Sequence, residues 1–404
     1  MNIGIDIRIL AKGTRTGVEN YTVNLLSGLL EKDKSIIYKL FCNGFKKPKL
    51  DYYWLGLNNV KIKILRIPNR ILDLFLRFLR FPRIDGIVGG VDIFLSPHFL
   101  LLPVDKKTKT IVVFHDLSFV RFPEFFSFSK LIWHKFIYPK NQARKADLII
   151  AVSDSTKNDL INLYEILQEK IKVIYPAAGK EFRKIEKTDQ KLLRVKEKYN
   201  LPDSFVLYFG TIEPRKNISG LIEAFEKIKK QETKIPLEVQ WDGFEGMVRG
   251  EKKNLFSFRK LKLVIAGNRG WLYGDVFEKI EKSPYREDII VTGFIEESDR
   301  PYLYNLAEIF VYPSFFEGFG FPPLEAMACG IPVAVSNKSS LPEVVGDSAI
   351  MFDPQNIDEI GFAIKNILQD RGLKELLIEK GLQRAKLFNW DKTAEEFLNI
   401  FKKI

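Results

Sequence analysis

Short apolar segments rich in Val, Ile and Phe recur along this chain, and stretches with helical spacing separate them. Continuous apolar runs are typical of strands covered on both faces, and alternation of strands with helices is typical of parallel sheets. The first series of runs comprises residues 2–10, 36–42, 60–67, 91–97, 110–116, 146–153 and 170–176. The second comprises residues 204–210, 261–267, 288–294, 309–314 and 332–336. The pattern predicts an α/β protein with two doubly wound domains, in which 332–336 is the last strand.

The length of 404 residues also favours two domains. Apolar periodicity stops and charge rises near residues 176–190, where we expect the boundary. We therefore predict one Rossmann-like domain over 1–180 and a second over 181–385. The remaining residues, 386–404, have amphipathic helical spacing and are expected to pack back on the first domain. The segment 236–260 lacks periodicity and is interpreted as an insertion.

Charge and cysteine content narrow the class of protein further. The chain has 63 Lys+Arg and 51 Asp+Glu, a net charge of +12, which favours anionic partners unless it only reflects a Lys-rich solvated surface. No zinc-finger spacing, RNA-binding signature or low-complexity basic arm is present, so nucleic acid is not expected as a partner. Cys42 and Cys329 lie far apart, which argues against a disulfide framework and for a reducing compartment.

Neither a signal peptide nor a membrane-spanning segment is expected for this chain. The first ten residues, MNIGIDIRIL, carry charges where a signal peptide has an apolar region. No segment contains the roughly 18 to 20 uncharged apolar residues that span a bilayer. We therefore expect a cytoplasmic protein.

Two adjacent cations follow the first strand of the second series. Gly210 ends this strand, Pro214 imposes an extended path, and Arg215 with Lys216 stand where a helix is expected to begin. Ligands of parallel sheets bind beyond the carboxyl ends of the strands. Two cations at a helix N-terminus there suit a diphosphate, and the position favours this interpretation over a solvated charged turn.

The stretch FFEGFGFPPLEAMACG, residues 315–330, holds two carboxylates eight positions apart, Glu317 and Glu325. Its glycines let the backbone approach a ligand closely, and its prolines fit the first turn of a short helix that carries Glu325. Carboxylates accept hydrogen bonds from paired sugar hydroxyls, so the two could hold two different sugar rings. Alternatively, Glu317 caps the helix and Glu325 forms a surface ion pair, and spacing alone does not decide between these.

Residues 317–354 as a whole resemble the donor-site signature of retaining glycosyltransferases of family 4. Other segments match the same family in the right order, and they are residues 16–26, 96–103, 112–126, 210–225, 263–271, 291–314 and 388–397. The resemblance implies the GT-B fold, in which two Rossmann-like domains face a central cleft. It also implies a hexosyltransferase that retains the anomeric configuration. No Asp-x-Asp occurs in the chain, so we expect no metal and no cofactor other than the nucleotide-sugar donor.

The resemblance further implies roles for single residues. Arg215 and Lys216 resemble the pair that neutralises the donor diphosphate, although many members of the family carry the Arg earlier, where this chain has Thr211. Glu325 resembles the glutamate that binds the ribose hydroxyls, and Glu317 the one that holds the transferred sugar. Phe294 and Ile295 resemble the edge that binds the base, and Gly17, in the loop after the first strand, the glycine that approaches the phosphate. The remaining expected donor-site residues are Gly210, Gly318, Phe319, Gly320, Phe321 and Leu324.

His115 and Asp116 lie at the end of a strand of the first domain. The resemblance implies that His115 lies near the reacting sugar carbon and that Asp116 lies on the acceptor side. A lone histidine in such a place is otherwise a structural residue. The predicted catalytic residues are then His115, Arg215, Lys216 and Glu317.

The chemistry expected of these residues is electrostatic. Cleavage of the bond between sugar and phosphate leaves negative charge on the diphosphate, which Arg215, Lys216 and nearby backbone N–H groups stabilise. The subgroup with the motif GTIEPRKN includes many enzymes that use GDP-mannose, so this donor is predicted, with UDP- and dTDP-sugars as alternatives. The expected acceptor is a glycan or a polyprenyl-diphosphate-linked saccharide of cell-surface polysaccharide synthesis.

Two other classes of protein fit the sequence less well. A dinucleotide-dependent oxidoreductase lacks support because no G-x-G-x-x-G follows the first strand. A non-catalytic sugar-binding module is disfavoured because Arg215, Lys216, Glu317 and Glu325 are all present.

One segment suggests contact with a membrane. Residues 69–84 place Ile71, Leu72, Phe75, Leu76 and Leu79 on one side at helical spacing, with arginines elsewhere. Basic charge beside apolar bulk is typical of a helix lying in an anionic interface. The same spacing also fits a helix packed on its own sheet. The expected location is therefore cytoplasmic, with peripheral contact at the inner face of the plasma membrane.

Overall fold

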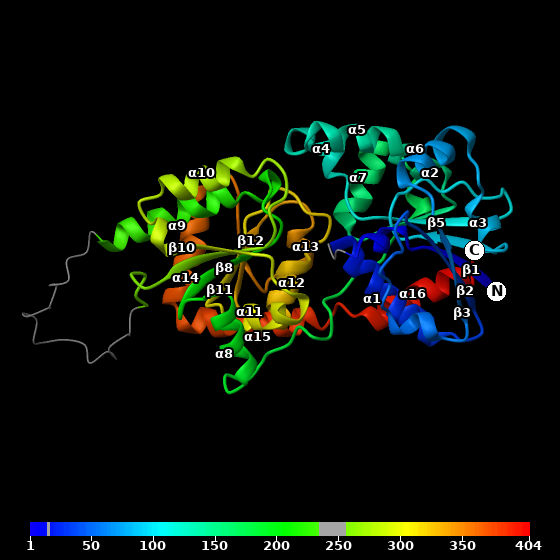
Figure 1. The fold of residues 1–404 in the computed structure, drawn as a ribbon. Coiled ribbons are helices and arrows are strands. Elements are labelled where there is room, and N and C mark those ends of the chain that lie inside the picture. Colours follow the sequence, from blue (N-terminus) through cyan, green and yellow to red (C-terminus); the bar gives the residue numbers. More distant parts are fainter. Residues whose placement is uncertain (14–16, 234–255) are drawn as a thin grey trace, which may run out of the picture. The chain divides into compact units, whose positions relative to one another are not determined.

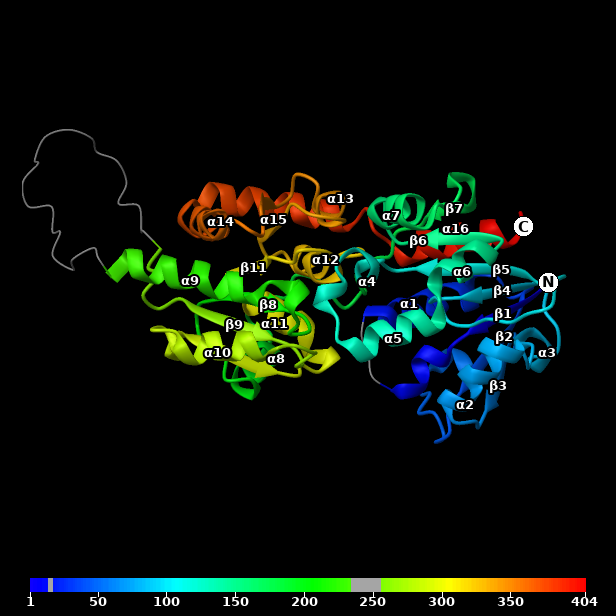
Figure 2. The same ribbon diagram turned by 90° about the horizontal axis from the view of Figure 1, so that it is seen from above.

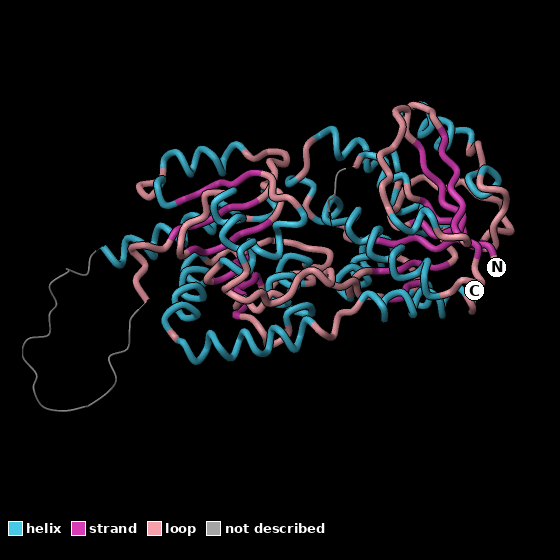
Figure 3. The backbone as a smooth tube through the Cα atoms, turned by 60° about the horizontal axis from the view of Figure 1, so that its bottom comes forward, coloured by secondary structure: helices cyan, strands magenta, loops and turns pink. Residues whose placement is uncertain are grey.

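The computed structural model describes residues 1–13, 17–233 and 256–404. Most of the predicted insertion 236–260 therefore lies outside the described residues. Contacts divide the chain into two units, Met1–Gly179 with Phe388–Ile404, and Lys180–Leu387. Each unit contains one parallel sheet enclosed by helices (Figure 3). Among the described residues, no helix combines the length and the apolar character needed to cross a bilayer.

The first unit is built on a sheet of parallel strands in the order β3-β2-β1-β4-β5-β6-β7. The strands are β1 Asn2–Asp6, β2 Ile37–Asn43, β3 Val60–Leu65, β4 Ile93–Ser96, β5 Lys109–Phe114, β6 Leu148–Ala151 and β7 Ile171–Val173. The helices are α1 Gly17–Lys32, α2 Asn69–Leu74, α3 Ile84–Ile87, α4 Ser118–Arg121, α5 Phe128–Ile137, α6 Pro139–Lys145, α7 Asp154–Tyr164 and α16 Trp390–Phe401. A π-helical turn, Phe75–Leu79, continues α2.

Apolar side chains cover both faces of this sheet. On one face, Phe94 and Phe114 pack in a core that includes Leu72, Leu76 and Leu160 of the surrounding helices. On the other face, the hydroxyl of Tyr38 in β2 donates to a backbone carbonyl of α1 (3.1 Å). Burial on both faces explains why these strands are continuous apolar runs in the sequence.

The C-terminal helix α16 packs on α1, more than 350 residues earlier in the chain (Figures 1 and 2). Its start is fixed by Asn389, whose side chain accepts from the backbone N–H of Asp391 (2.7 Å). Thr393 ties the helix to the rest of the unit by donating to the carbonyl of Tyr175 (2.7 Å). The last segment of the chain therefore completes the core of the first unit.

The second unit has parallel strands in the order β10-β9-β8-β11-β12-β13. The strands are β8 Phe205–Phe209, β9 Lys262–Ala266, β10 Ile289–Gly293, β11 Ile309–Tyr312, β12 Val333–Ser336 and β13 Ile350–Phe352. The helices are α8 Gln190–Lys198, α9 Ile218–Thr233, α10 Gly274–Lys282, α11 Arg300–Leu306, α12 Phe321–Ala328, α13 Leu341–Val345, α14 Ile357–Gln369 and α15 Arg371–Ala385. The chain runs from β8 outward to β9 and later returns to the other side of β8 with β11.

Two predictions about strands are wrong, one about where the first strand ends and one about which strand is the last. The run 2–10 is not one strand, because the backbone N–H of Arg8 donates to the carboxylate of Asp6 (3.0 Å) and turns the chain into a short 3₁₀ helix, Arg8–Lys12. The segment 332–336 is not the last strand either. β13 pairs beyond it, and this strand is short, with only Phe352 fully buried, so its apolar signal in the sequence is weak.

The segment 69–84 is not one amphipathic helix with a single apolar face. Leu72 and Leu76 are buried in the core, whereas Ile71, Phe75 and Leu79 of the predicted face are exposed. The helical path ends at Arg80, whose φ of 50° lies in the left-handed region. The predicted apolar stripe is therefore wider than the part that the sheet covers.

The docking of α16 can be tested by truncating Phe397, which is fully buried. We expect Phe397→Ala to lower the free energy of unfolding by about 3 to 5 kcal/mol, because it leaves a cavity under the helix. The matched control is Phe362→Ala, the same substitution at a helical position that is 64% exposed, which should change stability by less than about 0.5 kcal/mol. Urea unfolding followed by tryptophan fluorescence measures both, and equal effects would contradict the packing described.

Candidate active site

The order of the strands in the second unit determines where a ligand site is expected. The chain leaves β8 toward β9 on one side, and β11 lies on the other side of β8. Such a reversal of strand order leaves a crevice at the carboxyl ends of the two strands, where ligands of open parallel sheets bind. The segments after β8 and β11, residues 210–217 and 313–321, carry Gly210, Arg215, Lys216 and residues 317–321 of the predicted site.

A buried ion pair joins these two segments. The ammonium Nζ of Lys216, after β8, lies 2.6 Å from Oε1 of Glu317, after β11. The same Nζ donates to the hydroxyl of Tyr312 at the end of β11 (2.7 Å). Lys216 and Glu317 are each 7% exposed, which excludes the solvated charged turn considered from the sequence.

Arg215 adds a second bridge between the same segments. Its Nη1 donates to the carbonyl of Phe316 (2.6 Å) and lies 3.1 Å from Oε2 of Glu317. Its Nη2 and Nε both donate to Oε1 of Glu213 (2.7 and 3.1 Å). Glu213 is buried and was not predicted as a site residue, although its place two positions before the arginine in GTIEPRKN was a signal for pairing.

The charges of this cluster set its protonation states. Burial alone would raise the pKa of Glu317, but Arg215 and Lys216 reverse the effect and lower it to about 2. Burial and the charge of Arg215 lower the pKa of Lys216, against the attraction of Glu317. Burial raises the pKa of Tyr312 well above its ordinary value. At neutral pH the cluster therefore holds a carboxylate and a neutral phenol.

The loop that carries Glu317 is held by the segment after β12. The backbone N–H of Glu317 donates to Oγ of Ser339 (2.8 Å), and Oγ of Ser340 donates to the carbonyls of Glu317 and Phe319 (3.0 and 2.6 Å). Gly320 then adopts φ 120°, where a Cβ would also lie 2.9 Å from a methyl group of Leu341. Gly320 itself is the N-cap of α12, without a side-chain cap, so Glu317 is not the helix cap considered from the sequence.

Glu325 belongs to a second buried ion pair. Nη2 of Arg300 lies 2.7 and 2.8 Å from the two carboxylate oxygens of Glu325, and the hydroxyl of Tyr304 donates to Oε2 (2.8 Å). Because Glu325 is buried on α12, this is not the surface ion pair considered from the sequence. Arg300 and Tyr304, both on α11, were not predicted, since a single arginine far from Glu325 in sequence gives no signal. A carboxylate offers about four acceptor positions, so hydrogen bonds from a ligand remain open to it.

The other expected donor-site residues differ in exposure. Phe294, just beyond β10, is 61% exposed, whereas Ile295 is buried. Gly210 follows β8 and donates its N–H to the end of β9. Within 318–324 the backbone runs through the loop and into α12, and Leu324 is fully buried, so its side chain belongs to the core.

The first unit holds the remaining predicted residues. Nε2 of His115 lies 2.8 Å from the carbonyl of Pro97, which only accepts, so Nε2 carries a proton. Burial lowers the pKa of His115, which keeps the ring neutral at neutral pH. Asp116 accepts from the N–H and the hydroxyl of Ser118 (2.9 and 2.6 Å) at the start of α4. Gly17 is the first residue of α1 rather than part of a loop.

The structure thus forms two clusters within the second unit. Arg215, Lys216 and Glu317 lie together, and Glu325 lies with Arg300.

Comparison with known proteins decides the family. A model described as Glycosyltransferase Family 4 matches residues 15–178, and a model described as Glycosyl transferases group 1 matches residues 189–384. O-antigen chain mannosyltransferase B of Escherichia coli is 33% identical over 322 residues, which cover 77% of this chain and 74% of the relative. The chain belongs to the glycosyltransferase group 1 family.

Solved structures of other proteins have the same fold as this glycosyltransferase. Sucrose-phosphate synthase of Thermosynechococcus elongatus has a TM-score of 0.74 at 18% identity, covering 100% of this chain and 98% of the other. Anabaena HepE, in complex with UDP-glucose, has a TM-score of 0.71 at 16% identity, covering 100% of both chains. The predicted GT-B fold, with two Rossmann-like domains, is confirmed.

The lowered pKa of Glu317 predicts a pH dependence of stability. Because this pKa is about 2 in the folded glycosyltransferase and near 4.5 ordinarily, the ion pair stabilises the fold fully above pH 4.5 and is lost as the pH falls toward 2. The Glu317→Gln variant has no carboxylate to protonate at this position. As the pH falls, we therefore expect its free energy of unfolding to decrease by up to about 3 kcal/mol less than that of the wild type.

The control for this experiment is Glu379→Gln, which removes an exposed carboxylate of the same unit. Urea unfolding at a series of pH values between 5 and 3 gives the slope for each protein. Identical slopes for wild type and Glu317→Gln would show that Glu317 is not the stabilising carboxylate.

Proposed function

We propose that this glycosyltransferase transfers mannose from GDP-mannose, with retention of the anomeric configuration, to a glycan or polyprenyl-diphosphate-linked saccharide of cell-surface polysaccharide synthesis. The observation that carries the proposal is the buried cluster of Arg215, Lys216 and Glu317 at the reversal of strand order in the second unit. The mannosyl donor is supported by the relative that is named an O-antigen chain mannosyltransferase and is 33% identical.

Lys216 is suited to bind the donor diphosphate. An ammonium group has three N–H bonds, and Lys216 directs two of them to Tyr312 and Glu317. The remaining N–H bond is available to a phosphate oxygen, at a nitrogen whose position two partners already fix. Donors that are held in place before the reaction stabilise developing charge without the cost of reorganisation.

Arg215 complements Lys216 in the same proposal. Glu213 and the carbonyl of Phe316 hold its guanidinium in one orientation. The positive charge beside the leaving diphosphate is then built into the protein, and the proposed reaction needs no metal ion. Glu317, ionised between the two cations, accepts hydrogen bonds from hydroxyls of the transferred mannose.

Glu325 and His115 have supporting roles in the proposal. Glu325, oriented by Arg300 and Tyr304, accepts from the ribose hydroxyls of the nucleotide. His115, neutral and protonated on Nε2, presents Nδ1 as an acceptor near the reacting sugar carbon. The base of the nucleotide lies against the edge formed by Phe294 and Ile295. The enzyme acts in the cytoplasm, at the inner face of the membrane that holds the acceptor.

Activity measurements on site variants test the assignment of the cluster. We expect Lys216→Ala and Glu317→Ala each to lower kcat/KM for GDP-mannose by about 10²-fold or more, because each removes a charged contact with the donor. The matched control, Lys380→Ala, removes a lysine that forms an exposed ion pair with Asp347 in the same unit and should leave the rate unchanged. Unchanged turnover in both site variants would contradict the assignment.

A panel of donors tests the nucleotide and the sugar. GDP-mannose, UDP-glucose and a dTDP-sugar are compared at equal concentration, with and without EDTA. We expect turnover of GDP-mannose alone, at the same rate in both conditions. Use of a UDP- or dTDP-sugar instead would overturn the donor, and loss of activity in EDTA would overturn metal independence.

The stereochemical outcome is a separate prediction. The mannose of GDP-mannose is α-linked, so retention gives an α-linked product. NMR of the purified product identifies the anomer by the one-bond coupling between C1 and H1, because H2 of mannose is equatorial and the H1–H2 coupling is small in both anomers. A β-linked product would show inversion and would exclude the proposed course of the reaction.

A further inference from the structure

The segment 69–84 leaves a ridge of large apolar side chains exposed on the first unit. Phe78 is 72% exposed, Phe81 65% and Leu79 63%, and Leu74 and Phe75 are also exposed. Leu72 and Leu76 of the same segment are buried, so the ridge is anchored to the core beneath it. Folded proteins rarely leave such side chains clustered in water without a binding role.

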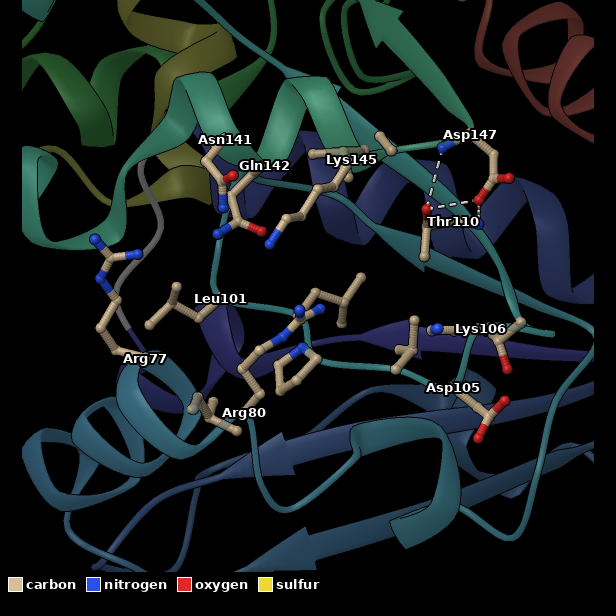
Figure 4. A pocket seen from close by; sticks show the side chains of 17 residues that line it. Arg77, Arg80, Leu101, Asp105, Lys106, Thr110, Asn141, Gln142, Lys145 and Asp147 are labelled. Carbon is tan, nitrogen blue, oxygen red and sulfur yellow. Dashed lines mark hydrogen bonds between the residues drawn. The ribbon is translucent and has the colours of Figure 1, made fainter.

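A pocket of about 400 Å³ lies beside this ridge (Figure 4). Arg77 and Arg80, from the same segment as the ridge, form one wall, and Gln142 and Lys145 of α6 form another. Figure 4 shows the side chains of Arg80 and Lys145 directed into the space between these walls. The cations and side-chain amides among the lining residues can donate hydrogen bonds to a phosphate.

The pocket lies away from the end of the sheet that carries the candidate catalytic histidine. Its lining includes Thr110, near the start of β5, and Asp147, just before β6. His115 follows the carboxyl end of β5, at the opposite edge of the same sheet. The pocket is therefore separate from the histidine's surroundings.

The positive charge of the pocket is not neutralised by its acidic residues. Asp147 is bound by Lys109 and by both the N–H and the hydroxyl of Thr110, and Asp105 pairs with Arg83. Within the described ranges 1–13, 17–233 and 256–404, neither Arg80 nor Lys145 forms an ion pair.

The pKa of Lys145 also reflects the neighbouring cations. Burial, followed by the charges of Arg80 and Arg77, lowers the pKa of Lys145. Like charges brought together in this way repel one another, and an anion between them would relieve the repulsion.

We propose that this pocket binds the phosphate-containing headgroup of an anionic phospholipid while the ridge of Phe75, Phe78, Leu79 and Phe81 enters the bilayer interface. The cations account for the phosphate, and the adjoining apolar side chains account for a lipid rather than a free phosphate. This is a binding site for the membrane itself and not for donor or acceptor. It holds or fails independently of the proposed sugar transfer.

Binding to vesicles in the absence of any sugar donor tests the proposal. The full chain is sedimented with vesicles of phosphatidylcholine alone and of phosphatidylcholine with 30% phosphatidylglycerol. We expect binding only to the anionic vesicles. Arg80→Asn with Lys145→Gln should weaken it roughly tenfold or more, because two cations at an anionic surface are lost. Asn tolerates the left-handed φ of Arg80, so the backbone is preserved.

The matched control is Lys34→Gln with Lys392→Gln, which removes the same charge at two exposed positions of the first unit. It should bind like wild type. A second arm replaces Phe78 and Leu79 with Ser, which should also abolish sedimentation while leaving thermal stability unchanged, since both side chains are exposed.

Three results would overturn the proposal. One is equal binding by the pocket variant and its control, since only net charge would then matter. Another is binding to vesicles of phosphatidylcholine alone. The third is loss of vesicle binding in the pocket variant but not in the serine variant, together with saturable binding of soluble glycerol phosphate, since the pocket would then take a free phosphate.

Discussion

The contact between Lys216 and Glu317 is the interaction on which the candidate site depends. It joins the segments after β8 and β11, which are 101 residues apart, at the point where the strand order reverses. Removing two charges from water is costly, and a buried ion pair often contributes little net stability. Its presence here is better explained by orientation than by stability. The pair holds an ammonium and a carboxylate in fixed positions at the edge of the sheet where ligands bind.

The surroundings of this pair explain why it is held so tightly. Tyr312 accepts from Lys216, and Ser339 with Ser340 fix the backbone of the loop on either side of Glu317. Arg215 is in turn oriented by Glu213. A cluster in which every charged group has a partner can keep its geometry before a substrate arrives, and this is the condition for electrostatic stabilisation of a leaving group.

The sequence predicted these residues but not their partners. The apolar runs predicted a strand before Lys216 and another before Glu317, and a parallel sheet places residues that follow its strands at one edge. The pattern of apolar runs did not predict the order of the strands in the sheet, so the contact between Lys216 and Glu317 could not be derived from it. Arg300 was missed for a similar reason, because its pairing with Glu325 depends on α11 packing beside α12. Single charged residues carry no periodicity that would predict such a contact.

Residues 69–84 show a different limit of sequence patterns. The helical spacing of apolar residues predicted an apolar face on this segment. It did not predict how much of that face would be buried against the sheet. Leu72 and Leu76 lie one turn apart and are buried, whereas Ile71 and Phe75, each one position earlier, are exposed. A rotation of about 100° per residue separates the two pairs, so the buried face is narrower than the apolar arc. The part of the arc left uncovered is what remains for another partner.

The buried cluster around Glu317 and the pocket beside the exposed ridge differ in net charge. Glu213, Arg215, Lys216 and Glu317 contain as many carboxylates as cations, so this cluster contributes nothing to the net charge of +12. The excess of positive charge must therefore lie elsewhere in the chain. Arg80 and Lys145, which converge without acidic partners among the described residues, are part of that excess. Part of the excess positive charge thus lies in the pocket beside the exposed ridge, which includes arginines of the segment 69–84 that the sequence analysis had singled out, and not in the cluster proposed to bind the donor.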